Sequence, residues 1–105
     1  MSLDGIRPRD QSRWLDVLDD ERGTLKIEFF RGLPFLHATF RRPLEAMRAA
    51  RAYFPQIRRW LKRMGHYEVF VAIPEGDAML ERFERSFGFV EYKRMNGHII
   101  LFQRT

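Results

Sequence analysis

The chain has 105 residues, of which 45% are hydrophobic and 31% charged, so we expect one globular domain spanning residues 1–105 and no long disordered part. No apolar run approaches the roughly 18 residues that a membrane span needs, and no basic-then-apolar leader is visible, which predicts a cytoplasmic protein. Cysteine is absent, which excludes disulfides, thiol catalysis and thiolate metal sites.

The basic residues are concentrated in the middle of the chain. The formal net charge is +5, yet the stretch from Arg41 to Arg63 contains eight basic residues and only one acidic residue, Glu45. Most of the basic residues are arginines, whose forked guanidinium binds phosphate and carboxylate groups through two hydrogen bonds. Such a segment could meet a polyphosphate cofactor, a nucleic acid or an acidic partner, or it could form a solvated helix face without a partner.

The first third of the chain predicts an extended piece, a short helix and a hairpin. Residues 6–10 predict a short extended piece that Pro8 interrupts. Asp10 or Ser12 could then cap a short helix that ends at Arg22-Gly23. The apolar side of that helix would carry Trp14, Leu15 and Leu18. Strict alternation then predicts strands over 24–30 and 33–40, joined by a tight turn at Arg31-Gly32.

A long helix is predicted from Pro43 to Gly65, because apolar residues recur there at steps of three and four. Pro55 lies inside this segment and predicts a kink or two abutting helices. The apolar stripe consists of Met47, Ala50, Phe54, Ile57, Leu61 and Met64. A basic stripe lies to one side of it and consists of Arg48, Arg51, Arg58, Arg59 and Lys62.

The last third predicts a buried strand, a helix and a hairpin. Residues 68–73 are nearly all apolar, which is typical of a central strand covered on both faces. Asp77 is placed to cap the next helix, which ends at Gly88, and Asn96-Gly97 predicts the turn between strands 89–95 and 98–103. The core side of that helix would carry Met79, Leu80, Phe83 and Phe87.

This order of elements predicts an α/β fold, more exactly an α+β mixed sheet with helices covering it. The helix between strands 33–40 and 68–73 makes a crossover connection, so these two strands should be parallel neighbours.

Three phrases of the sequence resemble the GNAT superfamily of N-acetyltransferases: residues 65–73, residues 77–89 with their closing Phe-Gly-Phe, and the Ile-Arg-Pro-Arg-Asp of residues 6–10. The resemblance implies a central mixed sheet flanked by helices. It also implies a reduced N-terminal half, because only one hairpin fits between Thr24 and Phe40. Small GNAT-like proteins of tailed bacteriophages, including relatives of an internal virion protein, have a similarly abbreviated layout.

The family's phosphate-binding signature, Q/R-x-x-G-x-G/A, is matched by residues 41–46, and acetyl-CoA is the cofactor that this resemblance implies. Arg41 and Ala46 fit its first and last places. Leu44 replaces the central glycine, Pro43 has no N–H to offer, and Glu45 adds an anionic side chain, so we expect a degenerate cofactor loop. The cofactor-binding residues would be Phe40, Arg41, Arg42, Leu44, Glu45 and Ala46.

The resemblance also places candidate catalytic residues. Glu84 occupies the position where many family members have a general-acid tyrosine, and it could donate a proton only if burial raised its pKa. His37 and Glu28 are the candidates for a general base. The alternative for all three, and the commoner outcome for such residues, is a solvated surface position on a helix or strand. The three histidines show no ligand spacing, so no metal site is predicted.

Three functions therefore stay open. The first is an acyl-CoA N-acyltransferase, either active or degenerate in its loop and catalytic groups. The second is a non-catalytic interaction protein, such as a homodimer or a phage structural or assembly protein associated with the virion, because a reduced sheet leaves open edges. The third is nucleic-acid binding through the basic stripe of residues 48–62.

Overall fold

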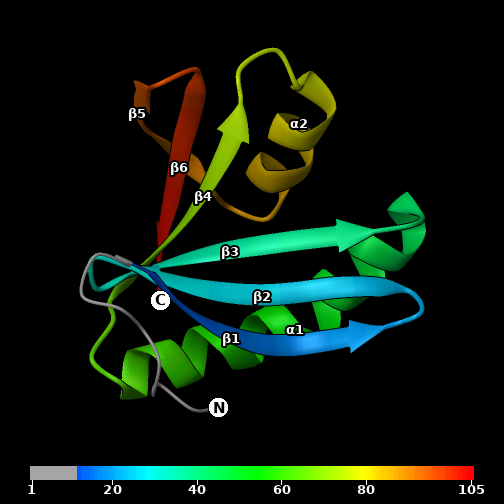
Figure 1. Cartoon of the computed structure of the whole chain (residues 1–105), viewed down its shortest axis with the longest axis horizontal. Coiled ribbons are helices and arrows are strands. Elements are labelled where there is room, and N and C mark those ends of the chain that lie inside the picture. The colour runs from blue at the N-terminus through cyan, green and yellow to red at the C-terminus, as the bar shows by residue number, and fades with distance from the viewer. Residues whose placement is uncertain (1–11) are drawn as a thin grey trace.

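The computed structural model describes residues 12–105, so the predicted extended piece at residues 6–10 and the capping role of Asp10 lie outside the described residues. Two helices and six strands form this part of the chain (Figure 1). In chain order they are β1 (Ser12–Asp20), β2 (Gly23–Phe30), β3 (Leu33–Phe40), α1 (Pro43–Arg63), β4 (Glu68–Pro74), α2 (Ala78–Ser86), β5 (Val90–Met95) and β6 (His98–Arg104).

The six strands form one mixed sheet in the order β1-β2-β3-β4-β6-β5. The pair β3 and β4 is parallel, as the crossover through α1 predicts, and every other neighbouring pair is antiparallel. This is the mixed α+β sheet expected from the sequence.

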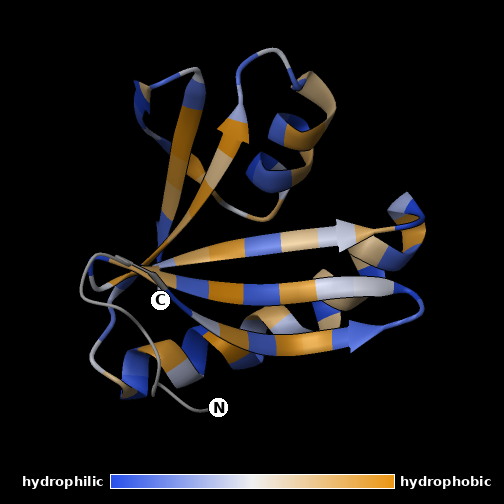
Figure 2. Ribbon diagram, in the orientation of Figure 1, coloured by the Kyte–Doolittle hydropathy of each residue, from blue (hydrophilic) through white to orange (hydrophobic). Residues whose placement is uncertain are grey.

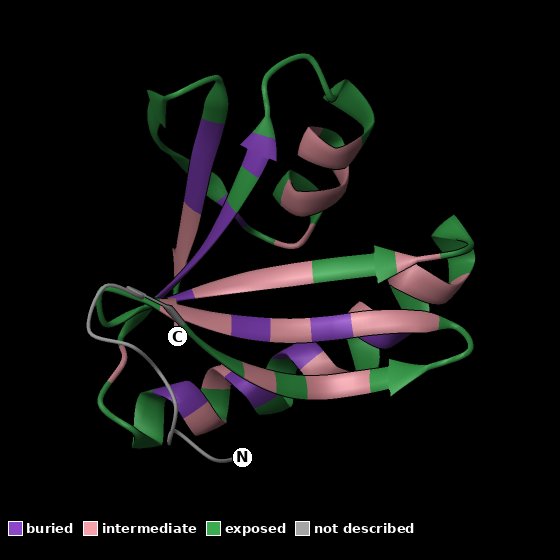
Figure 3. Ribbon diagram, in the orientation of Figure 1, coloured by how far each residue is buried: buried purple, intermediate pink, exposed green. Residues whose placement is uncertain are grey.

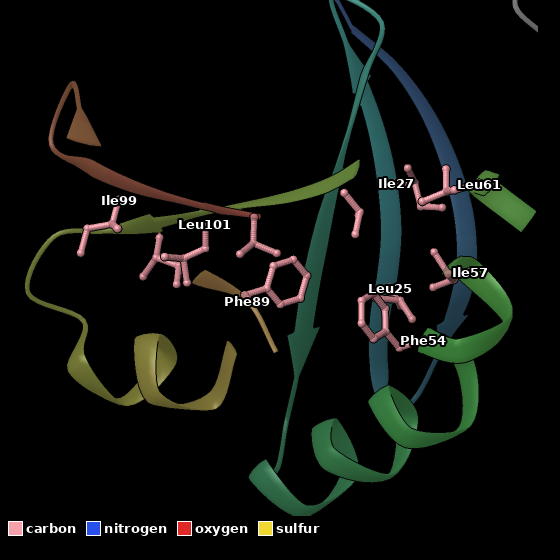
Figure 4. Close-up of a cluster of buried hydrophobic side chains, with 11 residues drawn as sticks. Leu25, Ile27, Phe54, Ile57, Leu61, Phe89, Ile99 and Leu101 are labelled. Carbon is pink, nitrogen blue, oxygen red and sulfur yellow. The ribbon is translucent and has the colours of Figure 1, made fainter. Parts of the chain in front are cut away.

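The core lies between one face of the sheet and the two helices. Figure 4 shows that α1 and α2 lie on the same side of the strands. Leu61 of α1, Val69 of β4 and Leu101 of β6 have no exposed surface at all. Phe89 links the two halves of the core, since its ring stacks on Phe54 with 5.6 Å between centroids. Buried positions alternate with partly buried ones along β2 and recur along the inner side of α1 (Figure 3).

The predicted short helix near the N-terminus is wrong, because residues 12–20 form strand β1. Trp14, Leu15 and Leu18 fit a helical spacing, but β1 pairs antiparallel with β2 from Ser12 opposite Phe30 to Asp20 opposite Gly23. A bulge between Asp16 and Leu18 breaks the two-residue alternation and explains why the strand pattern is hidden in the sequence. The N-terminal half therefore contributes a three-stranded meander instead of one hairpin.

Helix α1 is continuous through Pro55, so the predicted division into two helices is also wrong. Pro55 is exposed, and water can therefore satisfy the carbonyl that loses its N–H partner. The side-chain amide of Gln56 donates to the carbonyl oxygen of Ala52 over 3.0 Å, which gives this turn a further hydrogen bond. Phe54 and Ile57 are buried on either side of the proline and hold the helix against the sheet.

Helix α2 starts as predicted, with the carboxylate of Asp77 accepting from the amide of Leu80 over 3.1 Å. Its inner side differs from the prediction at Met79, which is 72% exposed. Leu80, Phe83 and Phe87 do face inward, and the fourth residue on that side is Glu84. Both predicted tight turns are present: Arg31-Gly32 and Asn96-Gly97 all adopt positive φ.

The second face of the sheet has no helix over it in the described part of the chain, so the predicted cover of β4 on both faces is only partial: on this face Phe70 is buried and Ala72 is exposed. Phe70 of β4 is buried there by other aromatic rings. It stacks on Phe35 at 5.3 Å, and the rings of Tyr92 and Phe102 lie 6.0 and 6.3 Å away. Orange ribbon on β4 and β6 marks their apolar residues in Figure 2. We call the cluster of Phe35, Phe70, Tyr92 and Phe102 the aromatic face.

Gly23, at the start of β2, provides a test of the meander. Its φ is +150°, and a Cβ there would overlap the carbonyl oxygen of Thr39 and the backbone of Phe40 on β3. We expect Gly23→Ala to lower the free energy of unfolding by about 3 kcal/mol, as a backbone clash inside a sheet requires. Gly32→Ala is the matched control, since a Cβ at Gly32 meets nothing within 4 Å and costs only about 1 kcal/mol for its positive φ. Urea unfolding of both variants measures the difference, and equal destabilisation would contradict the clash.

Candidate active site

The site begins where β3 and β4 part. Their only matched pair of residues is Phe35 and Phe70, whereas β2 and β3 are matched along their whole length from Gly23 opposite Phe40 to Phe30 opposite Leu33. Figure 1 shows β3 and β4 leaving one point and then diverging toward their carboxyl ends. The divergence leaves the later part of β3 without a hydrogen-bonded neighbour on that side.

A cavity of about 50 Å³ lies on the helix side of the sheet near this divergence, which is room for a group of a few heavy atoms. Strands β2 and β3, both helices and Phe89 contribute its wall. Eleven of its twelve lining residues are apolar, and the twelfth is Glu84. The lining consists of Leu25, Leu36, Ala38, Phe40, Ala46, Ala50, Phe54, Ile57, Phe83, Glu84, Phe87 and Phe89. The sequence assigned most of these to the core, and nothing in their spacing separates a cavity wall from a packed core.

Glu84 is the only ionisable group in this wall. Phe83 and Phe87 also contribute to the cavity from α2, so the helix presents the carboxyl group on the same side as two aromatic rings. Within residues 12–105 its carboxylate has no hydrogen-bond or ion-pair partner. Burial without compensation raises the pKa of Glu84 to about 7, because desolvation disfavours the charged form. At neutral pH the group is therefore divided between acid and carboxylate, which suits proton transfer.

The predicted cofactor loop lies at the start of α1. Arg42 is the N-cap residue and makes no side-chain cap hydrogen bond, and Pro43 is the first helical residue. The amide of Ala46 already donates to the carbonyl of Arg42 over 3.1 Å. Within the described residues, the amides of Leu44 and Glu45 have no acceptor, so this helix end keeps two free N–H donors.

The structure divides the predicted cofactor residues into two groups. Phe40 and Ala46 line the cavity. Arg41, Arg42 and Leu44 are exposed at the helix start, and Glu45 is half-buried. The loop thus joins the apolar cavity to a basic surface.

His37 and Glu28 lie elsewhere. Their Nε2 and Oε1 atoms are 2.8 Å apart, as diagonal neighbours on β3 and β2, and the ring of Trp14 lies 4.8 Å from that of His37. Because side chains alternate along a strand, this pair faces away from the buried Ile27 and from both helices. The structure therefore brings His37 and Glu28 to each other but not to Glu84.

Tyr53 and Trp60, two aromatic residues that fall off the apolar stripe of α1, line a second hollow. It is a surface groove of about 340 Å³ between α1 and the edge strand β1. The rest of its lining is Leu15, Asp16, Val17, Ile27, Gln56, Ile57 and Arg63. Trp60 is partly buried against Phe29, with 6.3 Å between ring centroids. The residue types here define no reaction chemistry.

No group of three or more His, Asp or Glu side chains that could hold a metal ion occurs among residues 12–105. In the same part of the chain, neither helix is both long and apolar enough to cross a membrane.

Comparison with known proteins agrees with the architecture. No family model and no curated protein matches the chain. Among solved structures, the chain is similar to the crystal structure of a "putative acetyltransferase from Agrobacterium tumefaciens", with a TM-score of 0.55 and 22% sequence identity. The match covers 90% of this chain and 76% of that one. At this identity the likeness shows the fold, which is acetyltransferase-like.

Glu84 also controls stability, and this can be measured without any ligand. The pKa is about 7 in the folded chain and near 4.5 when unfolded, so folding favours the protonated form. The free energy of unfolding should fall as pH rises from about 4.5 to 7, by up to about 3 kcal/mol. We expect Glu84→Gln to lose this pH dependence and to be more stable than the parent at pH 8. Urea unfolding of both proteins from pH 5 to 8 tests this; parallel stability curves would contradict the buried carboxyl.

Proposed function

We propose that this chain is an abbreviated GNAT-type protein that binds an acyl-CoA thioester, with acetyl-CoA as the simplest case, at the divergence of β3 and β4. The observation that carries the proposal is the apolar cavity behind that divergence, which contains a single carboxyl group whose pKa lies near neutrality. Its size suits a short acyl group, and the exposed Arg41 and Arg42 stand beside Phe40 and Ala46 of its wall.

In this proposal Arg41 and Arg42 neutralise the cofactor phosphates, and the free amides of Leu44 and Glu45 add hydrogen bonds at the positive end of α1. Pro43 removes one donor from this helix end, and Glu45 brings a negative charge to it. Fewer donors and a nearby carboxylate both weaken the binding of an anion, so we expect an affinity lower than that of a complete phosphate loop. This is the sense in which the site is degenerate.

Glu84 has the chemistry of the proton donor. When an amine attacks the thioester, the C–S bond breaks, a C–N bond forms, and the departing thiolate takes the proton that Glu84 holds. The proton lost by the amine passes to water, because His37 and Glu28 face the other side of the sheet. A donor with a pKa near 7 is lost as pH rises, so the rate of transfer should fall above neutrality.

Calorimetric titration with acetyl-CoA and a thiol-release assay with an amine acceptor test the proposal. We expect binding by the parent, and an acyl-transfer rate about 100-fold lower for Glu84→Gln with little change in affinity. Glu75→Gln is the control, since Glu75 is exposed in the turn before α2. Folded protein that gives no heat with acetyl-CoA would contradict cofactor binding, and an unchanged rate in Glu84→Gln would contradict the role of the carboxyl group.

The aromatic face favours a second candidate, a non-catalytic assembly module that pairs with a second copy of the chain. A sheet face that meets water is ordinarily polar, but here Tyr92 is 55% exposed beside the rings of Phe70 and Phe102. Such a face is self-complementary, so two copies could cover each other across a twofold axis. A structural role in a phage particle would be one form of this assembly.

Sedimentation analysis tests the assembly candidate. We expect a dimer that Tyr92→Lys dissociates by burying a charge in the aromatic face. Tyr67→Lys is the matched control, since Tyr67 is 66% exposed and lies outside the sheet. A parent protein that stays monomeric at high concentration, or equal behaviour of the two variants, would exclude this face as the contact between copies.

A further inference from the structure

The outward side of α1 carries five exposed basic residues and, between Arg48 and Arg63, no acidic residue. Four of the helix residues are buried against the sheet: Ala49, Phe54, Ile57 and Leu61. At 100° per residue, the exposed basic residues fall on the opposite side of the helix. We call them the basic face, and they are Arg48, Arg51, Arg59, Lys62 and Arg63. Blue ribbon along α1 marks its hydrophilic positions in Figure 2.

The charges of the basic face are not neutralised within the described part of the chain. Some basic side chains elsewhere have acidic partners, as Arg22 has with Asp20 and Arg85 with Glu81 and Glu91, whereas others, such as Arg82 and Arg104, have none within residues 12–105. None of the five residues of the basic face makes such a pair with any residue in 12–105. Unpaired like charges along one helix repel each other, which a polyanion would relieve.

The dimensions of the basic face suit an elongated ligand. From Arg48 to Arg63 the helix advances about 22 Å, at 1.5 Å per residue. This length corresponds to between about six and seven base pairs of duplex at about 3.4 Å each. Ala52 and Pro55 lie between the basic residues, so apart from its charged side chains this side of the helix offers small, apolar residues without hydrogen-bonding side chains.

The chemistry also separates nucleic acid from a membrane surface. A helix that binds in a lipid interface needs a free apolar side, and that side of α1 is already buried in the core. Four of the five basic residues are arginines, whose guanidinium fits a phosphate in bidentate fashion. We propose that the basic face of α1 binds the phosphate backbone of a nucleic acid duplex without sequence preference.

This proposal goes beyond acyl transfer and is independent of it. Arg51 and Arg59 line neither the cavity nor the groove beside β1. Replacing them should therefore leave acetyl-CoA binding unchanged, and a protein that binds duplex but no acyl-CoA would refute only the proposed enzymatic function.

Fluorescence anisotropy with a labelled DNA duplex of about 20 base pairs and random sequence, titrated at several salt concentrations, tests the proposal. The test variant is Arg51→Gln with Arg59→Gln. The control variant is Arg82→Gln with Arg104→Gln. Both arginines are exposed, on α2 and β6, and neither has an ion-pair partner in residues 12–105. The control therefore lowers the net charge by the same amount as the test variant. Circular dichroism confirms that both fold.

We expect the parent to bind the duplex, and the logarithm of its binding constant to fall linearly with the logarithm of the salt concentration. The test variant should lose at least about tenfold in affinity at low salt and about two units of salt slope, since each phosphate contact contributes about 0.9. The control should retain the parent slope. Equal losses in the two variants would show only a net-charge effect and overturn the proposal, as would absent duplex binding or tighter binding to phosphatidylserine vesicles than to DNA.

Discussion

The arrangement of the molecule depends on one short parallel contact, the pairing of Phe35 on β3 with Phe70 on β4. On one side of this contact the meander β1–β3 packs on α1, and on the other β4, β6 and β5 pack with α2. Stacking of the two phenylalanine rings at 5.3 Å reinforces the backbone pairing on the aromatic face. On the helix side, Phe54 and Phe89 make a second bridge between the halves. Beyond this pair β3 and β4 diverge, and this divergence produces both the opening in the sheet and the cavity behind it.

The sequence predicted most elements because their patterns agree with their surroundings. Alternation specified β2 and β3, the crossover rule specified the parallel pair, and Asp77 and Asn96-Gly97 marked a helix start and a turn. The failures have physical causes. In β1 a bulge disturbs the alternation, and pairing with β2 outweighs a helical spacing of three apolar residues. At Pro55 solvent exposure and flanking burial keep the helix whole.

The candidate site was less predictable because it depends on distance and burial. Spacing before the Gly-Phe pair drew attention to Glu84, but only the packing of Phe83 and Phe87 around the cavity shows why its pKa rises. The alternation of side chains along β2 and β3 puts His37 and Glu28 on the same face of the sheet, and this could be predicted from the sequence. Their separation from Glu84 could not, because it follows from both helices lying on the opposite face. The basic stripe was visible in the sequence, but that Arg58 is partly buried and that the exposed basic residues of α1 make no ion pair within residues 12–105 follow only from the structure.

The divergence of β3 and β4 behind a single matched pair has a mechanical consequence. The two halves of the sheet share one matched pair of strand residues, so a rotation about that pair would keep the hydrogen bonds inside each half, as in a hinge. Side chains from both halves line the cavity of about 50 Å³, so its width would change with this angle. Entry of a guest into the cavity would then be coupled to rotation of the halves, and the Phe54–Phe89 stack is the contact that would have to slide.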